Sequence, residues 1–355
     1  MKKMALTLLL ALGISAPALA DYRLIVPQEP GAGTSVWANI IAKPLASFLG
    51  EPVIVEHIPG AFDIPGFNKW HNELRKDPKT IMVAHGGNAE SFLTEKVDYN
   101  YALYEPIALV NLNIAVDKRT DADFSKDKIK FGASSGRRPD VMAMLLMVCG
   151  NLPNTDAYIQ CYKDKMIYLP SMTPAEGRMA AQRGELNTVR ETFASQKKFI
   201  DPLIEQKQFE FWFSHGVLDL KSGKIQPDKN FPAERDFQTL FKAKWGTEPR
   251  GEFYDAYVLV KNYRDVLQKS LWVDKDNPNA EKIRTAVRAM LTDPGAKEAL
   301  LKDTGDYEWF IGDDMSKAYD ILQKQLTEKS LKVLVKFNTE AIGLIAEYKP
   351  ELLKH

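Results

Sequence analysis

The sequence predicts an α/β protein built as two lobes. Short apolar runs alternate with longer amphipathic runs, and turns rich in glycine and proline separate them, which is typical of parallel α/β architecture. This alternation begins near residue 22, pauses at a long apolar run over 106–116, and restarts near residue 128. The apolar run can carry the chain from one lobe to the other, and a chain of 355 residues is long enough for two.

The first 20 residues have the pattern of a cleavable export signal. A basic start precedes an apolar stretch over 4–12, and residues 18–20 are Ala-Leu-Ala, which suits a cleavage site. The apolar stretch is shorter than a typical membrane span. We therefore expect an exported mature chain, located in a bacterial periplasm. An uncleaved membrane anchor is the alternative interpretation.

Charge and cysteine content exclude some functions. The chain has 47 basic and 47 acidic residues and no basic block, so nucleic acid is not an expected partner. Its two cysteines, Cys149 and Cys161, are expected to form a disulfide in an oxidising compartment. The five histidines lack metal-ligand spacing, so we expect neither a metal site nor a cofactor.

Hydrophobic periodicity gives the elements in order. In the first lobe we expect strands over 22–27, 53–56 and 80–84, and helices over 36–49 and 67–75. In the second lobe we expect strands over 128–131, 166–169, 186–189 and 209–213, and helices over 139–148, 174–183 and 193–204. A polar surface excursion over 220–251 follows, then a strand over 254–260, and mostly helix after 279 with a long amphipathic run over 315–346.

The turn after the first strand has the composition of an anion-binding turn. It contains Gly31-Ala-Gly-Thr-Ser35 immediately before an amphipathic run. Small residues allow backbone N–H groups to approach a ligand, and a helix start adds partial positive charge. A dinucleotide fingerprint would need a third glycine where Val36 stands. The remaining alternative is a turn with no ligand.

A second glycine-rich turn, 132–136, has the pattern G-x-S-x-G after an expected strand and before an expected helix. With His85-Gly-Gly upstream and His215 downstream, it permits an exported serine hydrolase or esterase that uses Ser134 and His215. Two observations weigh against a hydrolase. The base at His215 leaves a long α-rich tail unexplained, and the strands form two separate series rather than one large sheet.

The N-terminal block also resembles a family, the extracytoplasmic solute receptors of tripartite tricarboxylate transporters, known as Bug or TctC proteins. The resemblance is carried by Leu24-Ile-Val-Pro27, Pro30-Gly-Ala-Gly-Thr34, Gly50-Glu-Pro-Val-Ile-Val-Glu56 and Pro59-Gly-Ala61. Shorter matches follow in the family's order at 104–109, 131–136, 184–186 and 231–234. The order of these short matches is preserved over nearly the whole mature chain.

This resemblance implies a two-lobed periplasmic-binding-protein fold of type II, in which each lobe is a mixed sheet flanked by helices. The implied division is a signal peptide over 1–20, a first lobe over 21–108 and 222–355, and a second lobe over 109–221. The implied function is that of a solute-binding protein and not an enzyme. It would hold a small organic carboxylate between the lobes and deliver it to membrane permease subunits.

The ligand site is expected where strand-to-helix turns of the two lobes meet. The residues predicted to line it are Gly31, Ala32, Gly33, Thr34, Ser35 and His85 in the first lobe, and Ser134, Ser135, Gly136, Arg137, Glu191 and Thr192 in the second. Arg138 is weighed beside Arg137, because guanidinium groups suit carboxylates while a helix start disfavours cations. Ala32 and Ser35 replace the family's glycine and aspartate, so the identity of the ligand does not carry over.

Overall fold

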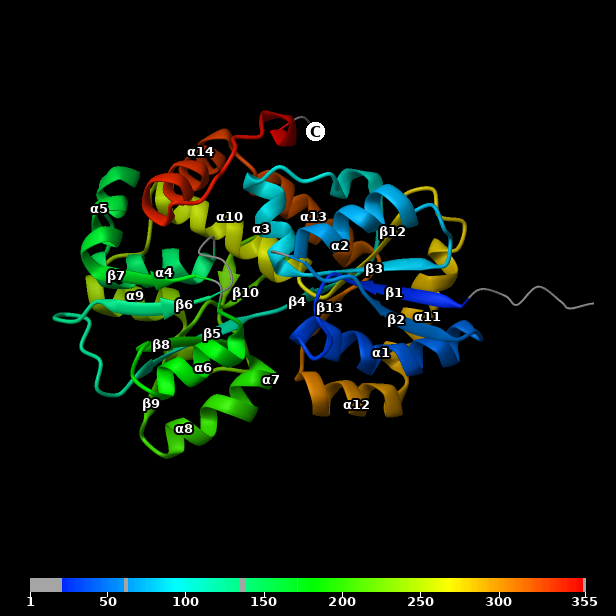
Figure 1. The fold of residues 1–355 in the computed structure, drawn as a ribbon, viewed down its shortest axis with the longest axis horizontal. Coiled ribbons are helices and arrows are strands. Elements are labelled where there is room, and N and C mark those ends of the chain that lie inside the picture. The colour runs from blue at the N-terminus through cyan, green and yellow to red at the C-terminus, as the bar shows by residue number, and fades with distance from the viewer. Residues whose placement is uncertain (1–20, 61–62, 134–137, 171, 354–355) are drawn as a thin grey trace, which may run out of the picture.

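The computed structural model describes residues 21–60, 63–133, 138–170 and 172–353 (Figure 1). Its larger sheet has six strands in the order β13-β4-β12-β3-β1-β2. These strands are β1 (Tyr22–Val26), β2 (Val53–His57), β3 (Thr80–Ala84), β4 (Tyr104–Asn111), β12 (Ser270–Asp274) and β13 (Glu308–Phe310). β1 runs parallel to β2 and β3, whereas β12 and β13 join antiparallel, so the sheet is mixed.

Helices cover both faces of this sheet, because its strands are apolar on both sides. Leu24 and Val26 pack on one face against α1 (Gly33–Leu49) and α11 (Ala280–Thr292), with α12 (Pro294–Thr304) beside them. Ile25 points to the other face. That face carries α2 (Ile64–Lys69), which continues as a π-helical turn, Trp70–Leu74, together with α3 (Gly86–Thr94) and α13 (Asp313–Gln325).

The second lobe contains a three-stranded antiparallel sheet in the order β8-β5-β9 and a parallel pair, β6 and β7. The strands are β5 (Ile114–Arg119), β6 (Ile129–Gly132), β7 (Met166–Leu169), β8 (Thr188–Thr192) and β9 (Phe209–Ser214). Asn187 places β6 beside β8, because its N–H and its Oδ1 bond the backbone of Lys130 at 3.1 and 2.7 Å. The observed β8 is displaced from the predicted strand over 186–189 toward the C-terminus.

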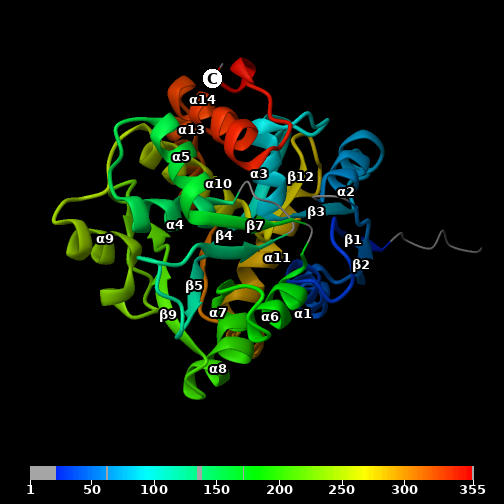
Figure 2. The same cartoon turned by 60° about the vertical axis from the view of Figure 1, so that its left-hand side comes forward.

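The helices of the second lobe largely match the predicted runs. They are α4 (Pro139–Cys149), α6 (Pro174–Gln182), α7 (Phe193–Ser195), a π-helical turn (Gln196–Ile200) and α8 (Asp201–Glu205). One further helix, α5 (Thr155–Lys165), was not predicted. α5 packs beside α10 (Glu252–Leu267) and α14 (Glu328–Phe337), as both views show (Figure 2).

The prediction of a strand over 254–260 was wrong, because these residues lie inside the long helix α10 (Glu252–Leu267). Asp255 is the one exposed residue among 254–260, so these residues form an almost continuous apolar run that is too short to reveal a helical period. Aromatic and β-branched residues such as Tyr257 and Val260 are enriched in strands, so the composition of this run favours a strand prediction. α10 packs on α3 and on α4, and one hydrophobic cluster joins Ile25 of the six-stranded sheet to Phe131 of β6.

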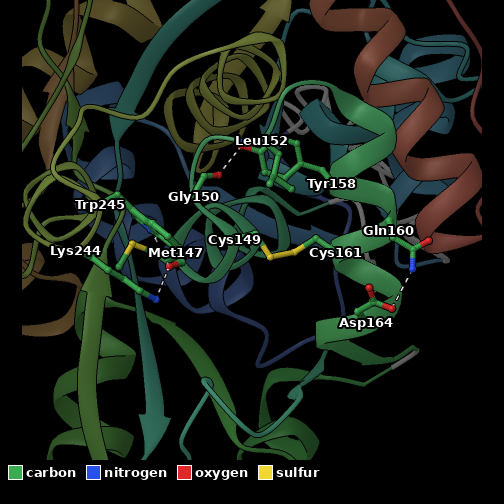
Figure 3. The surroundings of a disulfide bond; sticks show 10 residues. All are labelled: Met147, Cys149, Gly150, Leu152, Tyr158, Gln160, Cys161, Asp164, Lys244 and Trp245. Atoms are coloured by element: carbon green, nitrogen blue, oxygen red, sulfur yellow. Dashed lines mark hydrogen bonds between the residues drawn. A yellow bond between two sulfur atoms is a disulfide. The ribbon is translucent and has the colours of Figure 1, made fainter.

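The predicted disulfide is confirmed, since Cys149 at the end of α4 is bonded to Cys161 of α5 (Figure 3). The polar excursion, 220–251, contacts the chain close to this disulfide. It contains α9 (Phe237–Trp245), from which Lys244 Nζ and Trp245 Nε1 donate to Met147 O at 2.8 and 3.2 Å. The excursion therefore caps the last turn of α4.

The C-terminal region links several helices. The long amphipathic run over 315–346 is two helices, α13 and α14, and the side chain of Thr327 caps the second by accepting from Ser330 N. Lys336 of α14 pairs with Asp156 of α5 at 2.7 Å. Lys349 Nζ donates to Phe92 O and Glu95 O at the end of α3. In the part of the chain that the structure describes, no helix is both long and apolar enough to cross a membrane.

Candidate ligand-binding site

The first half of the site lies at one edge of the six-stranded sheet. β1, β2 and β3 are parallel, so the turns that follow them gather at their common carboxyl edge. The turn after β1 begins α1, and Ser35 in its first turn fixes the local backbone. The Ser35 Oγ accepts from Gly31 N at 3.2 Å and lies 2.7 Å from His57 Nε2 at the end of β2.

A chain of polar contacts joins this first turn to His85, which follows β3. Thr34 N donates to Gln28 Oε1 at 3.3 Å, and Gln28 Nε2 donates to Asp63 Oδ2 at 3.3 Å. The same carboxylate oxygen lies 2.6 Å from His85 Nδ1. The structure therefore brings the predicted residues of the first lobe together.

Sequence reasoning missed Gln28 and Asp63, which make this connection. Asp63 has a φ of +63°, a left-handed conformation that Asp and Asn tolerate better than most residues. Its carbonyl accepts from Asn88 Nδ2 at 2.9 Å, which holds the turn after β2 against the start of α3. The one sequence signal was an aspartate immediately before the Ile-Pro start of a helix.

The second half of the site lies where β6, β7 and β8 end. A small cavity of about 20 Å³, enough for one water molecule, lies there. Ala133, Met172, Arg190 and Glu191 are among the residues that line it. Glu191 is buried and pairs with Arg178 Nη1 at 2.6 Å; burial raises the pKa of this carboxyl although Arg178 opposes the shift. Thr192 follows as the N-cap of α7.

Four predicted residues of this half, Ser134, Ser135, Gly136 and Arg137, lie outside the described residues. The next residue, Arg138, is only 5% exposed. Its Nε and Nη1 have no hydrogen-bond partner among the described residues, and the carboxylate of Asp140 lies 3.9 Å away. Burial, with a contribution from Arg264, lowers the pKa of Arg138. A buried guanidinium with unused donors is suited to a carboxylate.

Asp140, in the first turn of α4, is the centre of a paired charge cluster. Its carboxylate is fully buried and lies 3.0 Å from His215 Nε2 and 3.4 Å from Arg190 Nε. Burial opposes ionisation, but Arg190 and His215 hold the pKa of Asp140 well below its usual range. The other ring nitrogen of His215 lies 2.9 Å from the Tyr257 hydroxyl.

This arrangement argues against the hydrolase alternative. His215 is 1% exposed, and both of its ring nitrogens already face partners. It therefore has no nitrogen free to accept a proton from a serine hydroxyl. In the described ranges, no three His, Cys, Asp or Glu side chains are grouped so that they could hold a metal ion.

Comparisons with known proteins place the fold among periplasmic binding proteins. The solved structure of the periplasmic binding protein BugD aligns with a TM-score of 0.55 and 16% identity, over 90% of this chain and 97% of BugD. MatC of Rhodopseudomonas palustris, solved with malate, aligns with a TM-score of 0.54 and 14% identity, over 88% of this chain and 99% of MatC. A second R. palustris protein, solved with adipate, aligns with a TM-score of 0.57 and 13% identity, over 90% of this chain and 98% of that protein. The predicted fold class is thus confirmed.

The sequence comparison is narrower. No family model matches the chain. Protein BugT of Bordetella pertussis is 40% identical over 60 residues, which are 15% of this chain and 18% of BugT. The resemblance to the Bug and TctC receptors is therefore confirmed by BugT in sequence over a short part of the chain, and by BugD and MatC in fold.

Proposed function

We propose that this chain is a periplasmic solute-binding protein that captures a small carboxylate between two lobes. The observation that carries the proposal is the state of the first turn of α1. The N–H groups of Gly33 and Ser35 have no acceptor among the described residues, and they lie at the sheet edge beside His85. Unpaired N–H groups at the start of a long helix are suited to a carboxylate.

The second lobe supplies complementary chemistry. Its strand ends carry Arg138, whose buried guanidinium has unused donors, and the turn after β8 with Glu191 and Thr192. We assign residues 21–108 and 222–355 to the first lobe and 109–221 to the second. In this proposal Ser134, Ser135, Gly136 and Arg137 line the ligand from the second lobe, as their place in the sequence predicts.

The structural relatives support a carboxylate ligand, since MatC was solved with malate and the second R. palustris protein with adipate. The export signal over 1–20 and the periplasmic relatives support a periplasmic location. We infer that the loaded receptor delivers its solute to the permease subunits of a tripartite transporter and has no catalytic role.

A thermal-shift and calorimetric screen of the mature chain tests this function. A carboxylate that binds the folded state raises the melting temperature with concentration. We expect at least one mono- or dicarboxylate, in a panel that includes malate and adipate, to raise the melting temperature and release or absorb heat. The methyl esters of the same acids serve as controls and should have no effect. A complete lack of response across the panel would contradict the proposal.

The predicted amide contact has its own test, because Gly33 is the first residue of α1 and a proline is tolerated there. The Ala32 backbone is extended, as a residue before proline requires, and a Cβ on Gly33 meets no atom within 4 Å. Gly33→Pro removes one N–H and should weaken carboxylate binding about 10-fold. Gly33→Ala keeps the N–H and should bind like the wild type. Equal affinities in the two variants would remove Gly33 from the site.

A further inference from the structure

Lys269 is a buried lysine at the same edge of the six-stranded sheet. It immediately precedes β12, and its N–H donates to Ala84 O at 2.9 Å. β12 is antiparallel to β3 with Ser270 opposite Ala84, so β12 begins where β3 ends. Lys269 therefore lies next to the turn that holds His85.

No carboxylate among the described residues neutralises the ammonium group of Lys269. The side chain is 5% exposed, and among the described residues neither a carboxylate nor a hydrogen-bond acceptor contacts it. The Lys269 Nζ lies over the ring of Tyr307, 5.0 Å from the ring centroid. Burial lowers the pKa of Lys269 to about 8, so the group still carries its charge at neutral pH. An unpaired buried charge normally disfavours the folded state.

Two neighbouring features show that the segment was not shaped for stability alone. Lys269 has a φ of +57°, a left-handed conformation that is strained for any residue with a Cβ. Gln268 is 6% exposed, and its Oε1 has no donor among the described residues. A Cβ placed on Gly86 would lie 2.8 Å from this oxygen, so the unpaired acceptor lies against the turn that follows His85.

The same place is close to the second lobe. Tyr307 follows Gly305, and a Cβ on Gly305 would lie 2.5 Å from Cδ1 of Phe193. Phe193 is the first residue of α7, directly after Thr192, and α7 lies beside α12 of the first lobe (Figure 1). Lys269 is thus next to the His85 turn, and the segment of Tyr307 that its ammonium contacts reaches the start of α7, beside Thr192.

We propose that Lys269 is a ligand-binding residue whose ammonium holds a carboxylate of the captured solute between the lobes. The inference rests on the proposed function and adds to it the positive charge that backbone N–H groups lack. A bound carboxylate would provide the anionic partner that none of the described residues supplies to this lysine. Gln268 Oε1 would accept from a hydroxyl or water of the ligand beside it.

The test compares Lys269→Met with Lys43→Met, whose lysine is exposed on α1. The affinities of malate and adipate are measured by calorimetry, and the melting temperature of each protein is measured without ligand. We expect Lys269→Met to weaken carboxylate binding roughly 10- to 100-fold. We also expect it to raise the melting temperature of the free protein, because the variant no longer buries a lone charge. Lys43→Met should change neither value.

The outcomes separate this inference from the proposed function. If the wild type binds no carboxylate of the wider panel, the proposed function fails and this assignment fails with it. If the wild type binds and Lys269→Met binds equally well, only the role of Lys269 is overturned. A lower melting temperature with unchanged affinity likewise identifies a structural lysine.

A measurement on the wild type covers the case in which Lys269→Met does not fold. Lysines are methylated with ¹³C, and their NMR signals are followed as malate or adipate is added. The Lys269 signal should move with ligand occupancy and its pKa should rise, while the Lys43 signal stays in place. A Lys269 signal that does not respond to a carboxylate that binds would overturn the assignment.

Discussion

Asp140 and Lys269 are both buried charges, but the chain surrounds them differently. Asp140 is held by His215 at 3.0 Å and Arg190 at 3.4 Å, contributed by separate segments of the second lobe. Within the described part of the chain, Lys269 contacts the ring of Tyr307 and no carboxylate. The attraction between paired charges offsets part of the desolvation penalty within the folded chain. For an unpaired charge this penalty is offset only when an oppositely charged molecule binds. The contrast separates a charge that serves the scaffold from one that serves a ligand.

The largest expected effect comes from breaking the paired cluster. Asp140→Asn leaves Arg190 beside an uncharged amide, and we expect the free energy of unfolding to fall by about 3–5 kcal/mol. Because the pKa of Asp140 is depressed in the folded state, its contribution is present above about pH 4 and is lost as the pH falls through the folded value. Urea unfolding between pH 3 and pH 7 measures both effects.

The control for that variant is Asp121→Asn. Asp121 pairs with Arg119 at 2.8 Å, but its side chain is 67% exposed. Removing its charge should cost less than about 1 kcal/mol, because water solvates both groups. A loss at Asp140 no larger than the loss at Asp121 would show that the buried cluster does not stabilise the scaffold.

The unpaired charge should act in a different pH range, and here the charged form destabilises the folded protein rather than stabilising it. The pKa of Lys269 is about 8 in the folded protein against 10.5 as the ordinary value, so between these values the unfolded chain binds more protons. Stability of the ligand-free wild type should therefore rise from pH 8 toward pH 10, by up to about 3 kcal/mol relative to Lys269→Met. Urea midpoints of the two proteins along this range measure the difference. Parallel profiles would mean that Lys269 is solvated or paired.

The disulfide sharpens the comparison because it concerns α4, the helix that carries Asp140 at its start and Cys149 at its end. Replacing Cys149 and Cys161 together by serine opens a loop with a sequence separation of 12 residues. The unfolded state then gains entropy, and stability should fall by roughly 3 kcal/mol. Unfolding and malate or adipate titrations measure stability and affinity. We expect affinity to stay unchanged; a large loss would place the α4–α5 link in the ligand site.

Most strands and helices could be predicted because their hydrophobic periods and turn residues agree. The parallel strands β1 and β3 are short apolar runs between glycine and proline turns, and both are observed. The failures have physical causes. The start of α10 is an apolar run over 254–260 with one exposed residue, Asp255, and the buried second half of the helix contains charged residues, so the polar pattern does not mark a helix face. β12 follows α10 without a glycine or proline to mark the boundary.

The candidate site was predictable where it depends on local turns and was missed where it depends on tertiary contacts. Glycines and small residues marked the start of α1, and the structure links that turn to His85. Asp63 and Lys269 reach the same edge only because strands far apart in sequence pair there. Both residues have left-handed backbones, Asp63 finds its partners only in the folded chain, and Lys269 has no charged partner among the described residues, none of which a single sequence reveals.

The order of strands in the larger sheet has a consequence for how the chain acquires its structure. β12 lies between β3 and β4, yet it comes from residues 270–274, after all the strands of the second lobe. Until those residues have been synthesised, β3 and β4 lack the strand that joins them. The middle of the chain, 114–214, contains every strand of its own sheets. The strands of the second lobe can thus pair before the first lobe has its central strand, and Lys269 reaches the candidate site only with that late strand.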